Sequence, residues 1–257
     1  MSATDEPRSI VRITLAFGAA APDLDALSAL AHLAATLRAE LSGVFIEDQD
    51  LLRLAALPVA REYFGSGAQR AIEIADMERQ LKRQADLARA ALMRSAELAG
   101  ARWTFVTARG SLARELGGRV EQSQAVAVGL TGRARNPFQA PVRSRAVAVA
   151  YAGGSAAQRA LELAQRLREA LRRPMILLVP ARTPDAAEAL LQDALTHLRV
   201  PPSRVFTVSG AKLSDVVLAA RTLSPALLLL EASESVMTAD AISYMNDELP
   251  CPALLVR

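Results

Sequence analysis

Two short glycine-containing stretches hold the residue types from which anion-binding turns are commonly built. The first is Gly129-Leu130-Thr131-Gly132, and the second is Gly153-Gly154-Ser155; each follows a short apolar run. Glycines let the main chain approach a ligand, and amides at the start of a helix offer donors and a favourable dipole to an anion. Arg133, Arg135 and Arg143 follow the first stretch and can add charge-assisted hydrogen bonds. The alternative is that the first stretch is an eroded turn before a linker, and that the second only lets a strand and a helix pack closely.

Residues that commonly hold metals are few. Glu47, Asp48 and Asp50 lie close together in the sequence, and carboxylate oxygens suit Mg²⁺. Such a cluster is also typical of a solvated loop that leads into a helix, and we expect no metal there. His32 and His197 have no second histidine or cysteine at a ligand spacing, which argues against a zinc site.

The sequence holds no recognisable catalytic set. Cys251 is the only cysteine and lies between two prolines, which favours a small buried apolar side chain over a nucleophile. No serine lies in a G-x-S-x-G turn. We therefore expect no catalysis. A single cysteine excludes an internal disulfide, and the polar start MSATDEPRS does not resemble a signal peptide, so we expect a cytoplasmic protein.

The charge and hydropathy of the sequence argue against nucleic acids and membranes as partners. The 257 residues carry a formal net charge of only +3, with arginines interspersed among acidic residues along predicted helices. That pattern is typical of a solvated helix surface and not of a nucleic-acid interface. The longest apolar runs, such as Ala226–Leu230, are too short to cross a bilayer. We expect neither nucleic acid nor a membrane as a partner.

A repeated strand, turn and helix positions the glycine stretches. Ala146–Tyr151 is predicted as a buried strand, and Ser155 as the N-cap of the helix that follows it. Ile10–Phe17 and the helix Asp23–Leu41 form the same unit earlier in the chain. At one constant offset Leu33, Ala34, Leu37, Arg38 and Leu41 match Leu163, Ala164, Leu167, Arg168 and Leu171. The chain is therefore predicted to hold two copies of one module.

Alternating strands and helices predict the fold class. Further strands are expected at Ser42–Ile46, Trp103–Thr107, Ala125–Val128, Met175–Val179, Val205–Val208, Ala226–Leu230 and Ala253–Val256, with a long helix over Ala68–Leu98. This order predicts an α/β protein of two doubly wound parallel-sheet sandwiches in tandem. We expect one domain over 1–132, which lacks a normal last helix and strand, a linker over 133–144, and a second domain over 145–257. Ligands of such sheets bind beyond the carboxyl ends of the strands.

The chain resembles the tandem universal stress proteins. The resemblance is carried by Leu41–Leu57, by Gly129-x-x-Gly132 after the fourth strand, and by CPALLVR in the last seven residues. It implies a five-stranded, Rossmann-like parallel α/β sandwich of the adenine nucleotide alpha hydrolase type. It also implies a bound ATP or related nucleotide in many members, and dimers formed through the final strand. Here such a pairing would give a homodimer or a pseudo-dimer within the chain.

The residues that would bind the nucleotide depart from the family's pattern. Neither first strand ends in the expected aspartate, Val142 stands where the third glycine belongs, and Glu231 replaces the first glycine of the second copy. A carboxylate at that position would repel a phosphate. If ATP or AMP binds, the resemblance implies the following site residues: Gly18, Val44, Gly129, Thr131 and Gly132 in the first copy, and Gly153, Gly154 and Ser155 in the second.

Three functions remain open at this point. The first is a non-enzymatic stress-response protein that senses or buffers through a small ligand or a protein partner. The second is an ATP- or AMP-binding protein with slow or no hydrolysis. The third is a structural interaction module whose sites have decayed, with an exposed apolar patch around Leu51–Leu57.

Overall fold

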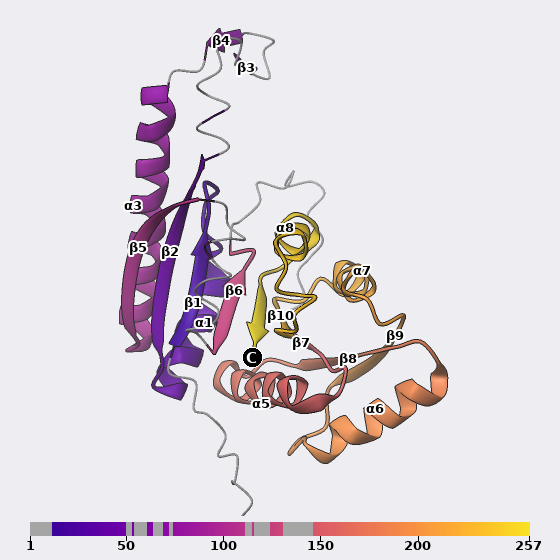
Figure 1. Ribbon diagram of the computed structural model, residues 1–257. Helices are drawn as coiled ribbons and strands as arrows, with labels where there is room; N and C mark the ends of the chain where they lie inside the picture. Colours follow the sequence, from indigo (N-terminus) through magenta and orange to yellow (C-terminus); the bar gives the residue numbers. More distant parts are fainter. Residues whose placement is uncertain are drawn as a thin grey trace, which may run out of the picture.

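A single mostly parallel sheet runs through the molecule (Figure 1). The computed structural model describes residues 12–49, 53, 61–63, 69–71, 74–110, 115, 124–130 and 146–257. Nine strands pair in the order β5-β2-β1-β6-β11-β10-β7-β8-β9. They are β1 (Arg12–Phe17), β2 (Glu40–Asp48), β5 (Arg102–Gly110), β6 (Ala125–Val128), β7 (Val147–Ala150), β8 (Met175–Ala181), β9 (Arg204–Ser209), β10 (Leu227–Glu231) and β11 (Ala253–Val256).

The central strands β6, β7 and β11 are short and buried on both faces. The sequences AVAV of β6, VAVA of β7 and ALLV of β11 are buried at every position. A strand covered on both sides has no need for polar residues, so it reads as a continuous apolar run. This is why the expected bounds of β6 and β11 agree with those of the structure.

The strand β11 joins the two parts of the sheet. It pairs in parallel with β10, where Leu254 lies opposite Leu229, and antiparallel with β6, where Leu254 lies opposite Ala127. The other neighbouring strands of the nine pair in parallel. The predicted α/β class with a mostly parallel sheet is confirmed, whereas the arrangement as two tandem sandwiches is not. The domain limits 1–132 and 145–257 remain predictions, and the linker 133–144 lies outside the described residues.

Helices cover both faces of this sheet. One face carries α1 (Leu24–Leu37), α3 (Ile74–Ala99), α5 (Gly154–Leu171) and α6 (Pro184–Thr196), and the other carries α7 (Leu213–Leu223) and α8 (Ala239–Glu248). Alternation along β10 shows how the faces divide. Leu227 and Leu229 belong to the core beneath α5, and Leu228 and Leu230 belong to the core beneath α7 and α8. The buried hydrophobic residues therefore form two cores, one on each side of the sheet.

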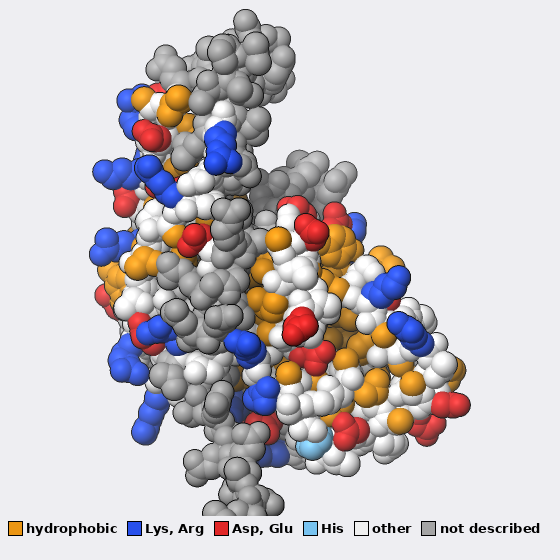
Figure 2. Space-filling view, viewed as in Figure 1, with side chains coloured by type: hydrophobic (Ala, Val, Ile, Leu, Met, Phe, Trp, Pro, Cys, Tyr) orange, Lys and Arg blue, Asp and Glu red, His pale blue; other side chains and the backbone are white. Residues whose placement is uncertain are grey.

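The long helix α3 starts later than the sequence predicted. Its amphipathic pattern indicated a start at Ala68, but the helix begins at Ile74. Gln69–Ala71 forms strand β4, which pairs antiparallel with β3 (Arg61–Tyr63). Acidic and basic side chains are interspersed along α3 (Figure 2), as expected for a solvated helix surface. Among the helices that the structure describes, none is both long enough and apolar enough to span a membrane.

Candidate functional site

The two glycine turns lie on opposite sides of the sheet along the strand direction, called here its first and second edges. Because β6 and β11 are antiparallel, the strands β1, β2, β5 and β6 run opposite to β7, β8, β9, β10 and β11. The carboxyl ends of the first group therefore emerge at one edge, and those of the second group emerge at the other. Gly18 and Gly129 follow β1 and β6 at the first edge, whereas Gly153 and Gly154 follow β7 at the second. The molecule thus has two separate candidate sites.

At the first edge the structure brings together the predicted residues that it describes. Gly18 directly follows β1, and Val44 lies fully buried in β2 opposite Ala16. Gly129 follows β6 with a φ of +70°, and a Cβ there would come within 3.6 Å of the main chain of Cys251 and Pro252. The positive φ favours glycine at this position, whereas the 3.6 Å approach is an ordinary contact distance. Thr131 and Gly132 lie outside the described residues.

The chain itself closes the first turn. The amide of Asp23 donates a 2.6 Å hydrogen bond to the carbonyl of Leu130, which ties the turn after β1 to the turn after β6. Leu130 is fully buried. The carboxylate of Asp23 also accepts a 3.1 Å hydrogen bond from the amide of Ala26, and Asp25 adds a second acidic group in the first turn of α1. Two carboxylates at this helix start disfavour an anionic ligand because they already compensate the helix dipole.

The second turn has the opposite character. Gly153 and Gly154 both have positive φ, of +88° and +85°, and α5 begins at Gly154. The predicted N-cap, Ser155, is wrong: Gly153 is the N-cap, makes no side-chain cap bond, and leaves Ser155 exposed inside the first turn. The first turn of α5 holds no acidic residue. Its amides are therefore available to an anion or to water.

Close packing also explains Gly153. A Cβ at this position would come within 3.1 Å of the Leu190 side chain, whereas a Cβ at Gly154 would meet no heavy atom within 4 Å. Gly153 thus lets the turn approach α6, whereas the close packing predicted for this stretch was between the strand and the helix that follows it. Gly154 has no such packing reason and is explained by its backbone conformation.

Beside the second turn lies a polar cluster that the sequence reasoning missed. The buried Tyr151 hydroxyl donates a hydrogen bond to the Asp193 carboxylate of α6. Nε2 of His197 lies 3.7 Å from the other Asp193 oxygen and 3.0 Å from the side-chain nitrogen of Gln158. Burial, together with the bond to Asp193, raises the pKa of Tyr151 to about 12, against an opposing effect of Gln158. The four-residue spacing of Asp193 and His197 was visible in the sequence. Their partners, Tyr151 after β7 and Gln158 on α5, could not be read from it.

Glu231 completes the second edge. It ends β10, and its position in the strand alternation directs the side chain to the face covered by α5. Burial raises the pKa of this carboxyl. The side chain makes no hydrogen bond or ion pair with any residue in the described part of the chain. A half-buried carboxylate disfavours a phosphate nearby, so the second edge combines open amides with one repelling charge.

The acidic residues at the end of β2 and the lone cysteine give no site in the described residues. Glu47 forms a 2.7 Å ion pair with Arg109, while Asp50 and the Asp48 side chain lie outside the description. Over the described ranges, no three His, Cys, Asp or Glu side chains lie close enough to hold a metal ion. Cys251 is 3% exposed, which fits the predicted role of a small buried apolar residue.

Comparison with known proteins adds a likeness of fold. No family model and no curated protein matches the chain. A universal stress protein from Archaeoglobus fulgidus DSM 4304 is similar over 95% of this chain and 96% of its own, with 12% identity and a TM-score of 0.49. The cytoplasmic domain of a prokaryotic cation chloride cotransporter is similar over 96% of this chain and 95% of its own, with 9% identity and a TM-score of 0.47. Neither likeness is close enough to support a conclusion about function.

Proposed function

We propose that this chain is a cytoplasmic, non-enzymatic stress-response protein of the tandem universal stress type, which senses or buffers through a small ligand or a protein partner. The observation that carries the proposal is the strand order β9-β8-β7-β10-β11, five adjacent parallel strands with helices on both faces. This is the architecture that the sequence resemblance implies. The order β5-β2-β1-β6 repeats the first four positions on the other side of β11 and supports the tandem arrangement.

The polar groups at the two turns support a role without catalysis. The Asp23 carboxylate caps α1, and the Tyr151 hydroxyl is hydrogen-bonded to Asp193. A pKa of about 12 keeps the Tyr151 phenol neutral at physiological pH, so it is a poor base and a poor nucleophile. These groups act in the proposal as structural anchors of the turns.

Binding of ATP or AMP is the second candidate, and the open N-terminus of α5 favours it. The turn offers two glycines with positive φ, uncapped amides and the exposed hydroxyl of Ser155. Glu231 opposes a phosphate at this edge, which favours little or no hydrolysis and weak binding. In this second candidate the nucleotide phosphates lie at Gly153, Gly154 and Ser155.

The first experiment is mass spectrometry of small molecules released from the purified, denatured protein, followed by thermal shift with ATP and AMP. A stoichiometric adenine nucleotide would favour the second candidate. Another small molecule would favour the ligand-sensing form of the first. An empty protein with no thermal shift leaves a protein partner as the form to pursue by affinity capture.

The variant Ser155→Asp separates a nucleotide at the second turn from one bound elsewhere. An added carboxylate at the start of α5 stabilises the helix but repels a phosphate, so the melting temperature should rise while the ATP-induced shift disappears. Ser214→Asp is the matched control, because Ser214 is exposed in the first turn of α7. If both variants keep the full ATP shift, the nucleotide does not bind at Ser155.

A further inference from the structure

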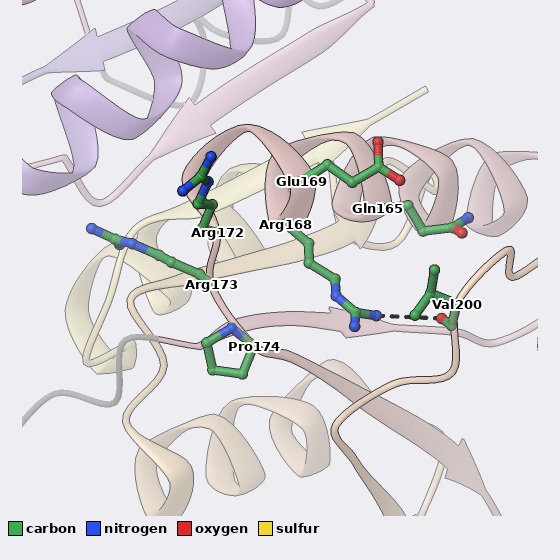
Figure 3. A pocket seen from close by; sticks show the side chains of 7 residues that line it. All are labelled: Gln165, Arg168, Glu169, Arg172, Arg173, Pro174 and Val200. Carbon is green, nitrogen blue, oxygen red and sulfur yellow. Dashed lines mark hydrogen bonds between the residues drawn. The ribbon is translucent and has the colours of Figure 1, made fainter.

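A groove lies at the opposite end of α5 from the glycine turn. It has a volume of about 430 Å³ and is lined by Gln165, Arg168, Glu169, Arg172, Arg173, Pro174 and Val200 (Figure 3). Pro174 directly precedes β8, so the groove faces the amino ends of the second group of strands. It is therefore separate from the carboxyl-end turns described above.

One wall of the groove is held in place by hydrogen bonds. Nη1 of Arg168 donates to the carbonyl of Val200 at 3.3 Å and to that of Pro201 at 2.9 Å. The Gln165 side chain, which is 8% exposed, donates to the carbonyl of His197 at 3.1 Å and accepts from the amide of Arg199 at 2.8 Å. The segment from 197 to 201 is thereby fixed against α5, and the groove exists before any ligand binds.

The other side of the groove carries two arginines with no partner among the described residues. Neither the Arg172 nor the Arg173 side chain forms a hydrogen bond or ion pair there, although Glu169 lines the same groove. In Figure 3 the guanidinium groups of Arg172 and Arg173 extend on the side away from Val200, and the Glu169 carboxylate is turned away from both. Arg172 itself is held at a φ of +49° at the end of α5, which fixes where its side chain starts.

We propose that this groove binds a small molecule with two negative charges on oxygen atoms, such as a phosphate ester or a dicarboxylate. The planar guanidinium forks of Arg172 and Arg173 suit the oxygens of such a group. Pro174 and Val200 supply apolar surface for the rest of the molecule. The volume lies in the range of about 300–1,000 Å³ that is typical of small-molecule sites. The three arginines outweigh Glu169, so the groove has a net positive charge.

A simpler role for these arginines makes a different prediction. Cations near the last turn of a helix stabilise it by interacting with the negative end of the helix dipole. If this were their whole role, replacing Arg172 and Arg173 would lower stability, and no anion would bind. Binding measured directly distinguishes the two roles.

The test is titration calorimetry of the whole chain with inorganic phosphate, pyrophosphate and succinate at matched ionic strength. We expect saturable binding of at least one probe, and the stronger probe identifies a phosphate or a dicarboxylate as the recognised group. The double variant Arg172→Gln/Arg173→Gln should weaken that binding about tenfold or more, because it removes charge-assisted hydrogen bonds. Arg83→Gln/Arg94→Gln removes the same charge from exposed positions of α3 and should leave the affinity unchanged.

A variant that binds more tightly tests the proposal independently, because a misfolded protein would not gain affinity. Glu169→Gln removes the one carboxylate of the groove and should tighten binding severalfold. The proposal is overturned if the wild type binds none of the three probes saturably, or if both double variants bind equally well.

Discussion

The two βα turns of this molecule occupy equivalent places after β1 and β7 and have opposite surroundings. The turn after β1 is closed, because Asp23 caps α1 and its amide bonds to Leu130. The turn after β7 is open, because Gly153 caps α5 without any side-chain bond. In the first turn an amide at the helix start donates to the Asp23 carboxylate. In the second turn the amides at the start of α5 remain available to solvent or a ligand.

This difference shows that a repeated sequence pattern does not imply a repeated site. Both turns lie at the carboxyl ends of strands, where parallel sheets commonly bind ligands. A single aspartate at the helix start decides whether the amides remain available there. Of the two turns, the one after β7 is therefore the better candidate for a ligand, with Glu231 as the group that disfavours anions there.

The largest expected effect tests whether the two parts fold as one. Leu254 is fully buried in β11, between β6 and β10, and Leu254→Ala should cost about 2–5 kcal/mol of unfolding free energy. Trp103, the only tryptophan, lies in β5 at the far edge of the first part, so its fluorescence reports on that part. We expect the urea midpoint from Trp103 fluorescence to fall together with that from circular dichroism. Leu218→Ala, at a side chain 64% exposed, is the control. An unchanged Trp103 midpoint would show that the parts unfold independently.

The glycines of the two turns should respond differently to a methyl group. Gly153→Ala forces a side chain into a φ of +88° and toward Leu190, which should cost about 1–2 kcal/mol. At Gly18 an added Cβ would meet no heavy atom within 4 Å, so Gly18→Ala should change stability by less than about 0.5 kcal/mol. Chemical denaturation of both variants measures the difference. Equal costs would contradict the contrast between the turns.

The next largest effect is expected from removing the helix N-cap of the first turn. Asp23→Ala removes the carboxylate that accepts from the amide of Ala26 and should cost about 1 kcal/mol. Ser155→Ala should change the unfolding free energy far less, because Ser155 caps nothing. Urea unfolding of the two alanine variants compares the turns directly. A loss at Ser155 as large as that at Asp23 would mean that Ser155 caps α5 after all.

The smallest effect is a pH dependence at the second turn. The pKa of Tyr151 is raised from 10.0 to about 12 in the fold. Burial, together with the bond to Asp193, favours the neutral phenol in the fold, so its contribution to the unfolding free energy is complete below pH 10 and is lost as the pH rises from 10 toward 12. Tyr151→Phe should cost about 1 kcal/mol at pH 8 and progressively less above pH 10. Urea midpoints of both proteins at pH 8, 10 and 11 measure this convergence, and a constant difference would contradict it.

The sequence predicted the nine strands of the large sheet, but it missed β3 and β4 and placed the starts of some helices wrongly. Buried strands such as β6 and β11 show as isolated apolar runs, so their bounds are local information. The start of α3 at Ile74 does not follow from local sequence, because residues 69–71 pair as β4 with β3 and the helix begins only after them. Ser155 looked like a cap because it is the first capping residue after the glycines. The positive φ of Gly153 and Gly154 lets the helix begin before it.

The pairing of β6 with β11 could not be predicted from the sequence, and neither could the polar cluster of Tyr151, Gln158, Asp193 and His197. Val126 and Leu255 lie opposite each other in the sheet, but nothing in either short apolar run specifies its partner. Tyr151 and Asp193 lie far apart in the sequence, and the packing of α6 on β8, the neighbour of β7, brings them together. Pairings across such sequence separations depend on the whole sheet, and they also decide which candidate site is open.

The central position of β11 has a consequence during synthesis. Of the nine strands, β11 is the last to leave the ribosome, yet its place is between β6 and β10 in the middle of the sheet. Until it arrives, β6 and β10 each present an unpaired edge, and such edges attract other chains. Until β11 has been made, the growing chain therefore exposes two strand edges in the middle of the sheet to pairing with other chains.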